Sequence, residues 1–283
     1  MVYFNIPCGG MTFLEKLETS VTQNNSLLCI GLDPDITKLP KVIGGKADPL
    51  VAFNKVIIDA TADLVCAFKP NSAFYEALGA DGIKQLRDTT QYIHDTYPHT
   101  PILLDYKRGD IGNTNKYYAQ FAFDYLSVDA ITISPYMGKE ANEAYLAHTD
   151  KGIFVLCRTS NPGAGEFQDL EHNGKKLYQI VAERIMNEWN DNKNCGLVIG
   201  SPYPTELATI RKLIGDDVLM LVPGAGTQGG DIEATVKAAV NASGTGVIIN
   251  SSREIIYASN GADFAEAARA KTQTLKTEIN KYR

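Results

Sequence analysis

Eight short apolar runs recur along this chain, and most of them are followed by an amphipathic stretch. The runs are apolar at successive positions instead of alternating, which indicates strands that are covered on both faces, as in a parallel sheet. Strands each followed by a helix predict a (β/α)8 TIM barrel, and the length of 283 residues suits one such domain spanning residues 1–283. A doubly wound sheet is the alternative, because periodicity does not reveal whether a sheet closes. The predicted strands are Leu27–Leu32, Leu64–Phe68, Ile102–Asp105, Ala130–Ser134, Ile153–Cys157, Gly196–Gly200, Val218–Val222 and Val247–Asn250, and the predicted helices are Pro49–Ala62, Asp81–His94, Asn115–Leu126, Lys175–Trp189, Thr205–Leu213 and Asp231–Val240.

Composition and charge exclude several classes of function. The net charge of −6 disfavours a nucleic-acid or acidic-membrane partner. The five cysteines are widely spaced and form no C-x-x-C pair, so we expect neither a disulfide nor a zinc site. No basic residue precedes Lys16, and no apolar stretch approaches the roughly 18 residues that a bilayer span needs. We therefore expect a cytoplasmic protein without a membrane segment.

The polar residues of interest follow the predicted strands directly. The carboxyl ends of parallel strands share one rim, where barrel enzymes build their active sites. The four histidines fall instead in helices or outer loops, which argues against a histidine base or a Ser-His-Asp triad. The residues at the rim are Asp33; Lys69 and Asn71; Asp105, Lys107 and Asp110; Thr159, Ser160 and Asn161; Pro223 and Gln228; and Arg253.

The most informative of these positions are Asp105, Lys107 and Asp110, which follow the apolar run Ile102-Leu103-Leu104. Side chains alternate along a strand, so Asp105 and Lys107 are predicted to point to the same side, while Asp110 lies in the loop beyond. Two unit charges about 4 Å apart interact by roughly 4 kcal/mol at an effective dielectric near 20. An ammonium between two carboxylates is a fixed positive charge and a proton donor, not an amine nucleophile. A buried ion-pair network without a catalytic role is the structural alternative.

The loops after the last two strands predict a phosphate site. Residues 224–229 fit the pattern G-x-G-x-x-G between a strand and a helix, but the next strand ends in Asn250, where a dinucleotide site would need an acid. Barrels commonly bind a monophosphate at this place through backbone N–H groups. Arg253 offers a forked cation and Gln228 a neutral donor. Glycines that serve only as turns, beside a surface arginine, remain the alternative.

The other rim residues allow two interpretations each. Lys69 ends an apolar strand and would reach the barrel mouth beside Asn71, or it extends to solvent without a role. Asp33 lies at a similar place after the first strand, or it forms an Asp-Pro turn. The stretch 159–161 could bind the edge of a polar ring or cap a turn.

The ordered set of motifs resembles the orotidine 5′-phosphate decarboxylase family. The resemblance covers nearly the whole chain and rests on Asp105-x-Lys107-x-x-Asp110-Ile-Gly-Asn-Thr114, together with Gly31-Leu32-Asp33-Pro34, Phe68-Lys69-Pro70-Asn71, the stretch from Pro223 to Gly229, and Arg253. It implies decarboxylation of orotidine 5′-phosphate to UMP and carbon dioxide, with no metal or organic cofactor. It also implies a homodimer in which Asp110 and Thr114 enter the partner's site.

The resemblance assigns the remaining roles position by position. Lys107 would protonate C6 of the pyrimidine, and Asp105 would orient Lys107 near the departing carboxylate. The other assignments are ribose contacts for Asp33 and Lys69 with Asn71 nearby, ring contacts for Thr159 or Ser160, and phosphate contacts for Pro223, Gln228 and Arg253. Long segments at 35–48 and 160–174, and the absence of an aromatic residue after Gln228, resemble the longer members of the family. They leave open whether Thr159, Ser160 or Asn161 makes the ring contact.

Two other functions compete with this interpretation. Metal-dependent barrels acting on sugar phosphates, such as keto-gulonate phosphate decarboxylase and hexulose phosphate synthase, share the D-x-K-x-x-D element. They place a magnesium-binding acid where this chain has Lys69, which would repel a cation. The other alternative is a barrel that binds a nucleotide phosphate without turnover.

Overall fold

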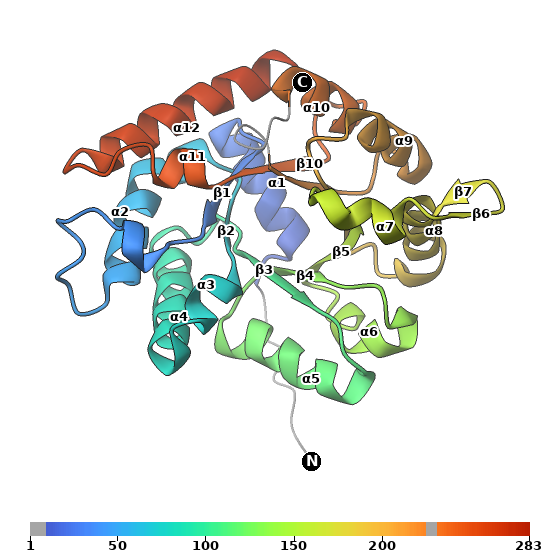
Figure 1. The fold of residues 1–283 in the computed structure, drawn as a ribbon, viewed down its shortest axis with the longest axis horizontal. Coiled ribbons are helices and arrows are strands. Elements are labelled where there is room, and N and C mark those ends of the chain that lie inside the picture. Colours follow the sequence, from blue (N-terminus) through green and yellow to red (C-terminus); the bar gives the residue numbers. More distant parts are fainter. Residues whose placement is uncertain (1–9, 225–230) are drawn as a thin grey trace.

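Eight parallel strands form a ring at the centre of the molecule, as the computed structural model of residues 10–224 and 231–283 shows (Figure 1). The strands are short and almost wholly buried, because helices cover the outside of the ring while side chains fill its interior. The strands of the ring are β1 (Leu28–Leu32), β2 (Ala67–Pro70), β3 (Leu103–Arg108), β4 (Ala130–Ile133), β5 (Gly152–Arg158), β8 (Cys195–Ile199), β9 (Met220–Pro223) and β10 (Val247–Ser251).

The ring closes between β2 and β3. Parallel ladders join the other strands in the order β2-β1-β10-β9-β8-β5-β4-β3. Isolated parallel bridges pair Phe68 with Ile102 and Asn71 with Asp105 across the remaining gap. The predicted barrel is therefore confirmed, and the doubly wound alternative is wrong.

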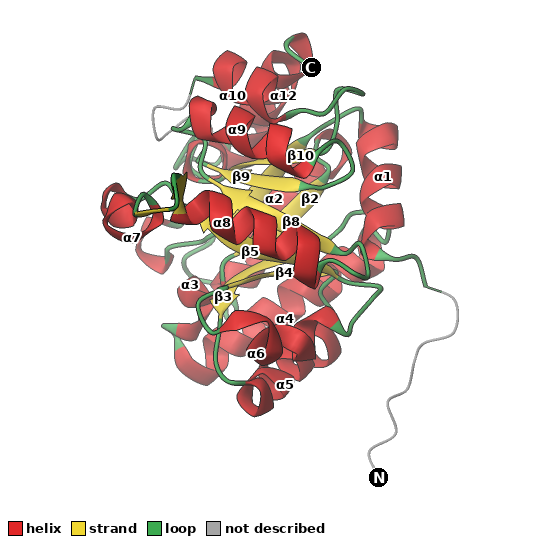
Figure 2. Cartoon of the chain, turned by 90° about the vertical axis from the view of Figure 1, so that its right-hand side faces the viewer, coloured by secondary structure: helices red, strands yellow, loops and turns green. Residues whose placement is uncertain are grey.

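Helices surround the barrel on its outside (Figures 1 and 2). The main core cluster lies between them and the outer faces of the strands. The larger helices of this layer are α2 (Pro49–Thr61), α4 (Gly79–Thr96), α5 (Gly112–Gln120), α6 (Gly138–Leu146), α8 (Leu177–Arg184), α9 (Pro204–Ile214), α10 (Ile232–Ala239) and α12 (Phe264–Lys281). Shorter elements lie in the loops after the strands: α3 (Ser72–Glu76), α7 (Gly165–Gln168), α11 (Arg253–Ile256) and the hairpin β6 (Glu171–His172) and β7 (Lys175–Lys176).

Helix α1 (Phe13–Asn24) packs against the amino ends of the strands. Its start is fixed by a capping box, in which Thr12 and Glu15 exchange hydrogen bonds. Phe13 packs edge-on against Phe154, with the ring centroids 5.8 Å apart. A side chain at Gly152 would collide with the Phe13 ring, so the close approach requires glycine. With this end filled, the carboxyl ends of the strands form the open end of the barrel.

The structure changes the bounds of three strands that carry site residues. Strand β9 runs from Met220 to Pro223 instead of from Val218 to Val222, so Pro223 ends the strand. Strand β2 begins at Ala67 rather than Leu64 because residues 62–64 form a 3₁₀ turn, and Lys69 lies inside the strand instead of beyond it. Strand β3 continues to Arg108, three residues past its predicted end. The predicted helix Asn115–Leu126 is present as α5 but begins earlier, at Gly112. The predicted helix Lys175–Trp189 begins only at Leu177, as α8, because Lys175 and Lys176 form the strand β7. Each helix continues into a π-helical turn, at residues 121–125 and 185–189.

The predictions about cysteines and membrane segments can be compared with the described residues. The four described cysteines, Cys29, Cys66, Cys157 and Cys195, are buried free thiols, while Cys8 lies outside these residues. Burial in apolar surroundings raises the pKa of Cys29, Cys157 and Cys195 to about 12, as for thiols with a packing role. None of the described helices combines the length and apolar character that a membrane crossing requires.

Candidate active site

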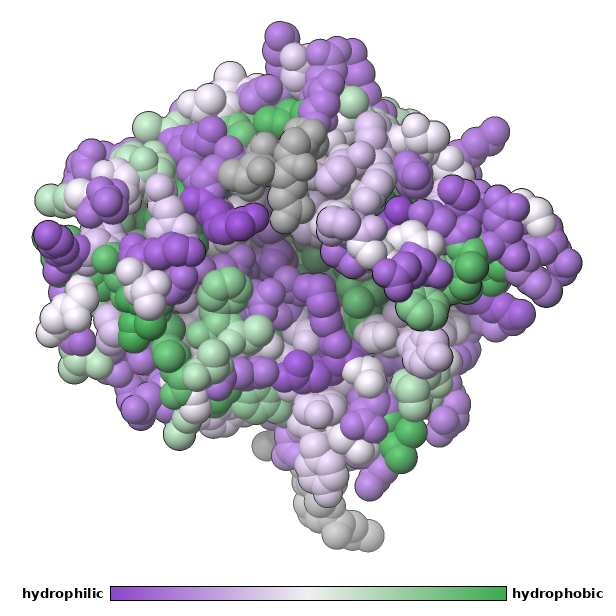
Figure 3. Space-filling view, viewed as in Figure 1, coloured by the Kyte–Doolittle hydropathy of each residue, from purple (hydrophilic) through white to green (hydrophobic). Residues whose placement is uncertain are grey.

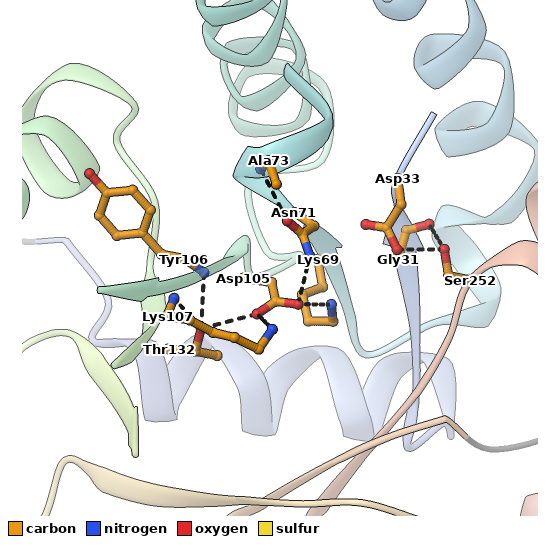
Figure 4. A network of polar contacts seen from close by, with 10 residues as sticks. All are labelled: Gly31, Asp33, Lys69, Asn71, Ala73, Asp105, Tyr106, Lys107, Thr132 and Ser252. Atoms are coloured by element: carbon orange, nitrogen blue, oxygen red, sulfur yellow. Dashed lines mark hydrogen bonds and ion pairs between the residues drawn. The ribbon is translucent and has the colours of Figure 1, made fainter. Parts of the chain in front are cut away.

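Asp105 is the centre of a polar network at the carboxyl ends of β2, β3 and β4 (Figure 4). Its Oδ1 accepts hydrogen bonds from Lys107 Nζ at 2.5 Å and from Thr132 Oγ1 at 3.1 Å. Its Oδ2 accepts from Lys69 Nζ and Asn71 Nδ2, both at 3.1 Å. Four donors fill the capacity of the carboxylate, so it is held in one orientation.

The charges of this network keep Asp105 ionised. Burial alone would raise the pKa of this carboxyl, but the neighbouring ammonium groups of Lys69 and Lys107 outweigh burial and lower it well below its usual range. Burial would likewise lower the pKa of Lys69, but the carboxylates of Asp105 and Asp33 raise it above the usual value. The Lys69 side chain is only 4% exposed, whereas that of Lys107 is 48% exposed. Lys69 is therefore a buried fixed charge, and Lys107 is the accessible ammonium.

Lys107 approaches Asp105 through an irregular backbone, not through regular strand alternation. The register between β3 and β4 shifts between Leu104 and Arg108, and Lys107 adopts the left-handed conformation with φ 49°. The N–H groups of Tyr106 and Lys107 both donate to Thr132 Oγ1 at 2.9 Å. The predicted proximity of Asp105 and Lys107 is confirmed, but the reason given for it was wrong.

The prediction of one ammonium group between two acids does not hold within the single chain. Among the described residues, the arrangement is a carboxylate, Asp105, between two ammonium groups. Asp110 makes no ion pair with Lys107 within these residues, and its Oδ1 instead accepts the Ile111 N–H at 2.7 Å. Buried Asn115 holds the Asp110 backbone by bonding both its N–H and its carbonyl oxygen. Thr114 lies in the first turn of α5, next to Asn115 in the chain.

Asp33 follows β1 directly, is partly buried and contacts the loop after β10. Its Oδ2 accepts a 2.7 Å hydrogen bond from Ser252 Oγ, while its Oδ1 is buried and has no hydrogen-bond partner among the described residues. Burial raises the pKa of Asp33, and the positive charge of Lys69 only partly opposes this. An acid with a buried free oxygen is suited to accept a hydrogen bond from a ligand hydroxyl.

The loop after β5 is held by a buried arginine. Arg158 donates to Asp169 Oδ2 at 3.0 Å and to the Thr159 carbonyl at 2.9 Å, and its guanidinium lies 4.3 Å from the centre of the Tyr203 ring. The Thr159 hydroxyl is already bonded, to Asn161 at 2.7 Å and to Gln168. Ser160 lies against Gly200 at the end of β8. Of the predicted ring contacts, Thr159 and Asn161 are thus engaged in holding the loop.

The expected phosphate end is described only in part. Pro223 ends β9 beside Asn250 of β10, and Arg253 begins the short helix α11 with an exposed side chain. Gln228 lies outside the described residues. Figure 3 shows the face viewed in Figure 1, with a hollow near its middle that is bordered largely by hydrophilic residues.

Sequence reasoning missed Thr132, Asn115, Ser252 and Arg158. Each is a polar or charged residue that contacts a predicted site residue. A polar residue inside an apolar run, such as Thr132 between Ile131 and Ile133, is a usable signal. The partners of Ser252 and Arg158 depend on loop conformations that the sequence pattern does not encode. Among the described residues, no three histidine, cysteine or acidic side chains are grouped so that they could hold a metal ion.

Comparisons with known proteins place this chain in a family. The sequence model of the family described as orotidine 5′-phosphate decarboxylase / HUMPS matches residues 26–268. An orotidine 5′-phosphate decarboxylase of Ralstonia pickettii is 50% identical over 273 residues, which cover 96% of this chain and 100% of the relative. The solved structure of Leishmania donovani OMP decarboxylase has a TM-score of 0.83 and 36% identity and covers 96% of this chain and 98% of that one. A Methanocaldococcus jannaschii enzyme of the same name, at 18% identity and a TM-score of 0.64, shares the fold. The chain therefore belongs to the orotidine 5′-phosphate decarboxylase / HUMPS family.

Proposed function

We propose that this chain decarboxylates orotidine 5′-phosphate to UMP and carbon dioxide, the last step of pyrimidine synthesis, with Lys107 as the proton donor to C6. The carboxy-lyase activity is that of relatives matched at 50% identity over their full length. The observation that carries the residue assignment is the accessible Lys107 ammonium, held 2.5 Å from a fixed carboxylate at the open end of the barrel.

The chemistry needs one carbon–carbon bond to break and one proton to be delivered. When the bond between C6 and the carboxylate breaks, carbon dioxide leaves and the electron pair stays on C6. Lys107 then donates a proton to C6 and becomes a neutral amine, which solvent reprotonates. A fixed ammonium beside the developing carbanion stabilises the transition state as well as supplying the proton. No cofactor takes part in this scheme.

The neighbouring residues bind the parts of the substrate that do not react. Asp33, with its buried free oxygen, and Lys69 with Asn71 are assigned to the ribose hydroxyls. Ser160 is favoured over Thr159 for the ring edge, because the Thr159 hydroxyl already bonds Asn161 and Gln168. The phosphate is assigned to Pro223, Gln228 and Arg253, where binding energy from the phosphate can serve the transition state.

A homodimer would complete the site. Exposed apolar side chains lie close to Asp110 and Thr114 in the chain, namely Ile111 and Tyr117, and the exposed Tyr136 lies in the loop after β4. The segments that follow β3 and β4 are joined, since Ser134 N donates to the Arg108 carbonyl at 2.8 Å. An apolar patch of this kind on one face is typical of a protein interface. We therefore assign Asp110 and Thr114 to the partner's site, where Asp110 would supply the second acid beside Lys107.

Two smaller assignments belong to the same proposal. The four buried thiols are in the reduced state expected in the cytoplasm, which we take as the compartment. Residues 1–283 are taken as one domain.

The activity is tested by following the absorbance of orotidine 5′-phosphate with purified protein, with and without a metal chelator. Lys107→Ala is expected to abolish decarboxylation while UMP still binds. Lys84→Ala, which removes an exposed lysine from an ion pair on α4, is the matched control and should leave turnover unchanged. Normal turnover by Lys107→Ala would reject the proton-donor role. Activity lost only with the chelator would favour the metal-dependent sugar-phosphate enzymes instead.

The shared site is tested by mixing variants. Asp105→Asn and Asp110→Asn subunits, inactive alone, should regain part of the activity when mixed, because one site of a mixed dimer contains neither substitution. Ile111→Asp should weaken the dimer in sedimentation, whereas Phe167→Asp, which changes an equally exposed apolar residue on α7, should not. Subunit exchange without recovery of activity would contradict the shared site.

A further inference from the structure

We propose that Thr132 is a positioning residue for the reaction: its single hydroxyl sets both the backbone of Lys107 and the orientation of Asp105. Thr132 lies in β4 and is almost completely buried. Three hydrogen bonds converge on its hydroxyl oxygen, from the N–H groups of Tyr106 and Lys107 and to the carboxylate of Asp105 (Figure 4). The inference deepens the proposed function, since it concerns how the assigned proton donor is held.

The hydrogen bonds of Thr132 use the whole capacity of a hydroxyl group. Its oxygen accepts the N–H groups of Tyr106 and Lys107, each at 2.9 Å, and its own hydrogen goes to Asp105 Oδ1 at 3.1 Å. A hydroxyl offers two acceptor positions and one donor, so no capacity is left over. This arrangement fixes the direction of the O–H bond, and Thr132 must donate to the acid.

The two accepted N–H groups lie at the irregular part of β3. The register with β4 shifts between Leu104 and Arg108, and the paired positions on either side are Leu104 with Ile131 and Arg108 with Ile133. Thr132, between Ile131 and Ile133, thus stands opposite the stretch of β3 that has left the ladder. Its side chain takes the place of a backbone carbonyl as the acceptor for that stretch.

The same irregular stretch gives Lys107 its left-handed backbone, with φ 49°. This conformation is uncommon for a residue with a side chain and persists only where the surroundings enforce it. Thr132 supplies that enforcement by binding the Lys107 N–H. The direction in which the Lys107 side chain leaves the backbone therefore depends on the Thr132 hydroxyl.

The third hydrogen bond links this backbone to the acid. Thr132 donates to the same oxygen of Asp105 that accepts the Lys107 ammonium. The Thr132 hydroxyl therefore contacts both parts of the Lys107–Asp105 pair. It holds the backbone N–H of Lys107, and it holds the Asp105 oxygen that accepts the Lys107 ammonium. The other two donors to Asp105, Lys69 and Asn71, hold the opposite oxygen and would remain without Thr132.

The test compares Thr132→Val, which keeps the shape and removes the hydroxyl, with Thr132→Ser, which keeps the hydroxyl. Because a misplacement of about 1 Å at a reacting group can cost roughly 100-fold, we expect Thr132→Val to lower kcat by about that factor. KM and the affinity for UMP should change little, because the residues assigned to ribose and phosphate are untouched. Thr132→Ser should restore most of kcat. Thr272→Val, which removes an equally buried hydroxyl that donates to a helix carbonyl on α12, is the matched control and should keep kcat.

Crystal structures of the two Thr132 variants give a readout that does not need activity. In Thr132→Val, Lys107 should leave the left-handed region and its ammonium should move away from Asp105, while Thr132→Ser keeps both. If Thr132→Val fails to fold, Thr132→Cys, which retains size but bonds weakly, must show the same loss of kcat. An unchanged kcat in Thr132→Val, or an unchanged Lys107 backbone, overturns the inference. Lack of turnover by the wild-type protein would reject the proposed function, and the crystal structures would still decide the role of Thr132.

Discussion

Lys69→Met is expected to destabilise the protein strongly, because it removes one ammonium from a buried ion pair and leaves the acid behind. The side chains of Lys69 and Asp105 are 4% and 11% exposed, and their charged atoms lie 3.1 Å apart. At an effective dielectric near 20, two unit charges at that separation interact by about 5 kcal/mol before the cost of desolvation. Removal of one partner from a buried pair typically costs about 3–5 kcal/mol. Since Asp105 keeps Lys107, we expect a loss near the lower end, about 3 kcal/mol.

A double-mutant cycle with urea unfolding measures this effect. Asp105→Asn should also destabilise, because it leaves the buried ammonium of Lys69 without its main partner. The double variant should lose less than the sum of the two, by about 1–3 kcal/mol, as for residues in direct contact. Lys84→Met is the matched control, since Lys84 lies 2.7 Å from Asp88 but both side chains are well exposed. A loss for Lys69→Met no larger than for Lys84→Met would refute the buried-pair argument.

The pH dependence gives a second check on the same pair. The pKa of Asp105 is lower in the folded protein than the unfolded value of about 3.9, so its contribution is complete above that pH and is lost as the pH falls through the folded value. The pKa of Lys69 is raised above about 10.4, so its contribution is complete below that pH and is lost as the pH rises further. The cost of Lys69→Met should therefore be constant from about pH 5 to 9 and shrink in acid. A cost that persists unchanged to pH 3 would contradict the assignment.

The remaining predictions concern the rim loops and Asp33. Arg158→Lys should destabilise by about 2 kcal/mol in urea unfolding and raise KM, because an ammonium cannot reproduce the forked contacts of the guanidinium; an unchanged KM would show that the loop is held otherwise. Gly200→Ala should weaken UMP binding in calorimetry, because the new Cβ would lie 2.7 Å from Ser160 Cβ and 2.9 Å from its backbone nitrogen; undiminished affinity would argue against Ser160 at the ring. Asp33→Asn should weaken UMP binding. It should also gain stability relative to wild type as the pH rises above about 3.9, because the pKa of Asp33 is raised in the folded protein. Over that range Asp33 ionises more readily in the unfolded wild-type chain, which lowers the stability of the wild-type protein. A stability difference between these two proteins that does not vary with pH would contradict this account of Asp33.

The barrel itself could be predicted because its signals are local and repeated. The run Leu28–Leu32 and the amphipathic helix Pro49–Thr61 are recognisable without knowledge of the rest of the fold. The position of Lys69 was harder, because the apolar run before it contains a 3₁₀ turn that hydrophobicity does not distinguish from strand. Helix α1 was missed since it caps the barrel instead of following a strand.

The sequence identified candidate residues for the site but not their geometry. Asp105 and Lys107 could be paired from their spacing, but the pairing depends on a left-handed residue and on Thr132 from another strand. Such a contact between segments 25 residues apart follows from the register of two strands, which the sequence does not specify. The position of Asp110 could not be predicted for a different reason. Among the described residues Asp110 contacts Ile111 and Asn115, and its proposed place beside Lys107 depends on the proposed partner subunit, which a single sequence does not reveal.

Two acids of the rim, Asp105 and Asp33, differ in a way that separates their roles. Asp105 receives four donors within the chain and has no acceptor capacity left for a ligand hydroxyl. Its charge instead holds Lys69 and Lys107 in place and neutralises part of their attraction for anions. Asp33 has one buried oxygen without a donor among the described residues, and its raised pKa reflects that incomplete solvation. A ligand hydroxyl that donates to this oxygen would stabilise the ionised form, so binding at Asp33 should lower its pKa and strengthen as the pH rises through it. In contrast, no ligand can lower the pKa of Asp105 by adding a donor, because every position for one is occupied.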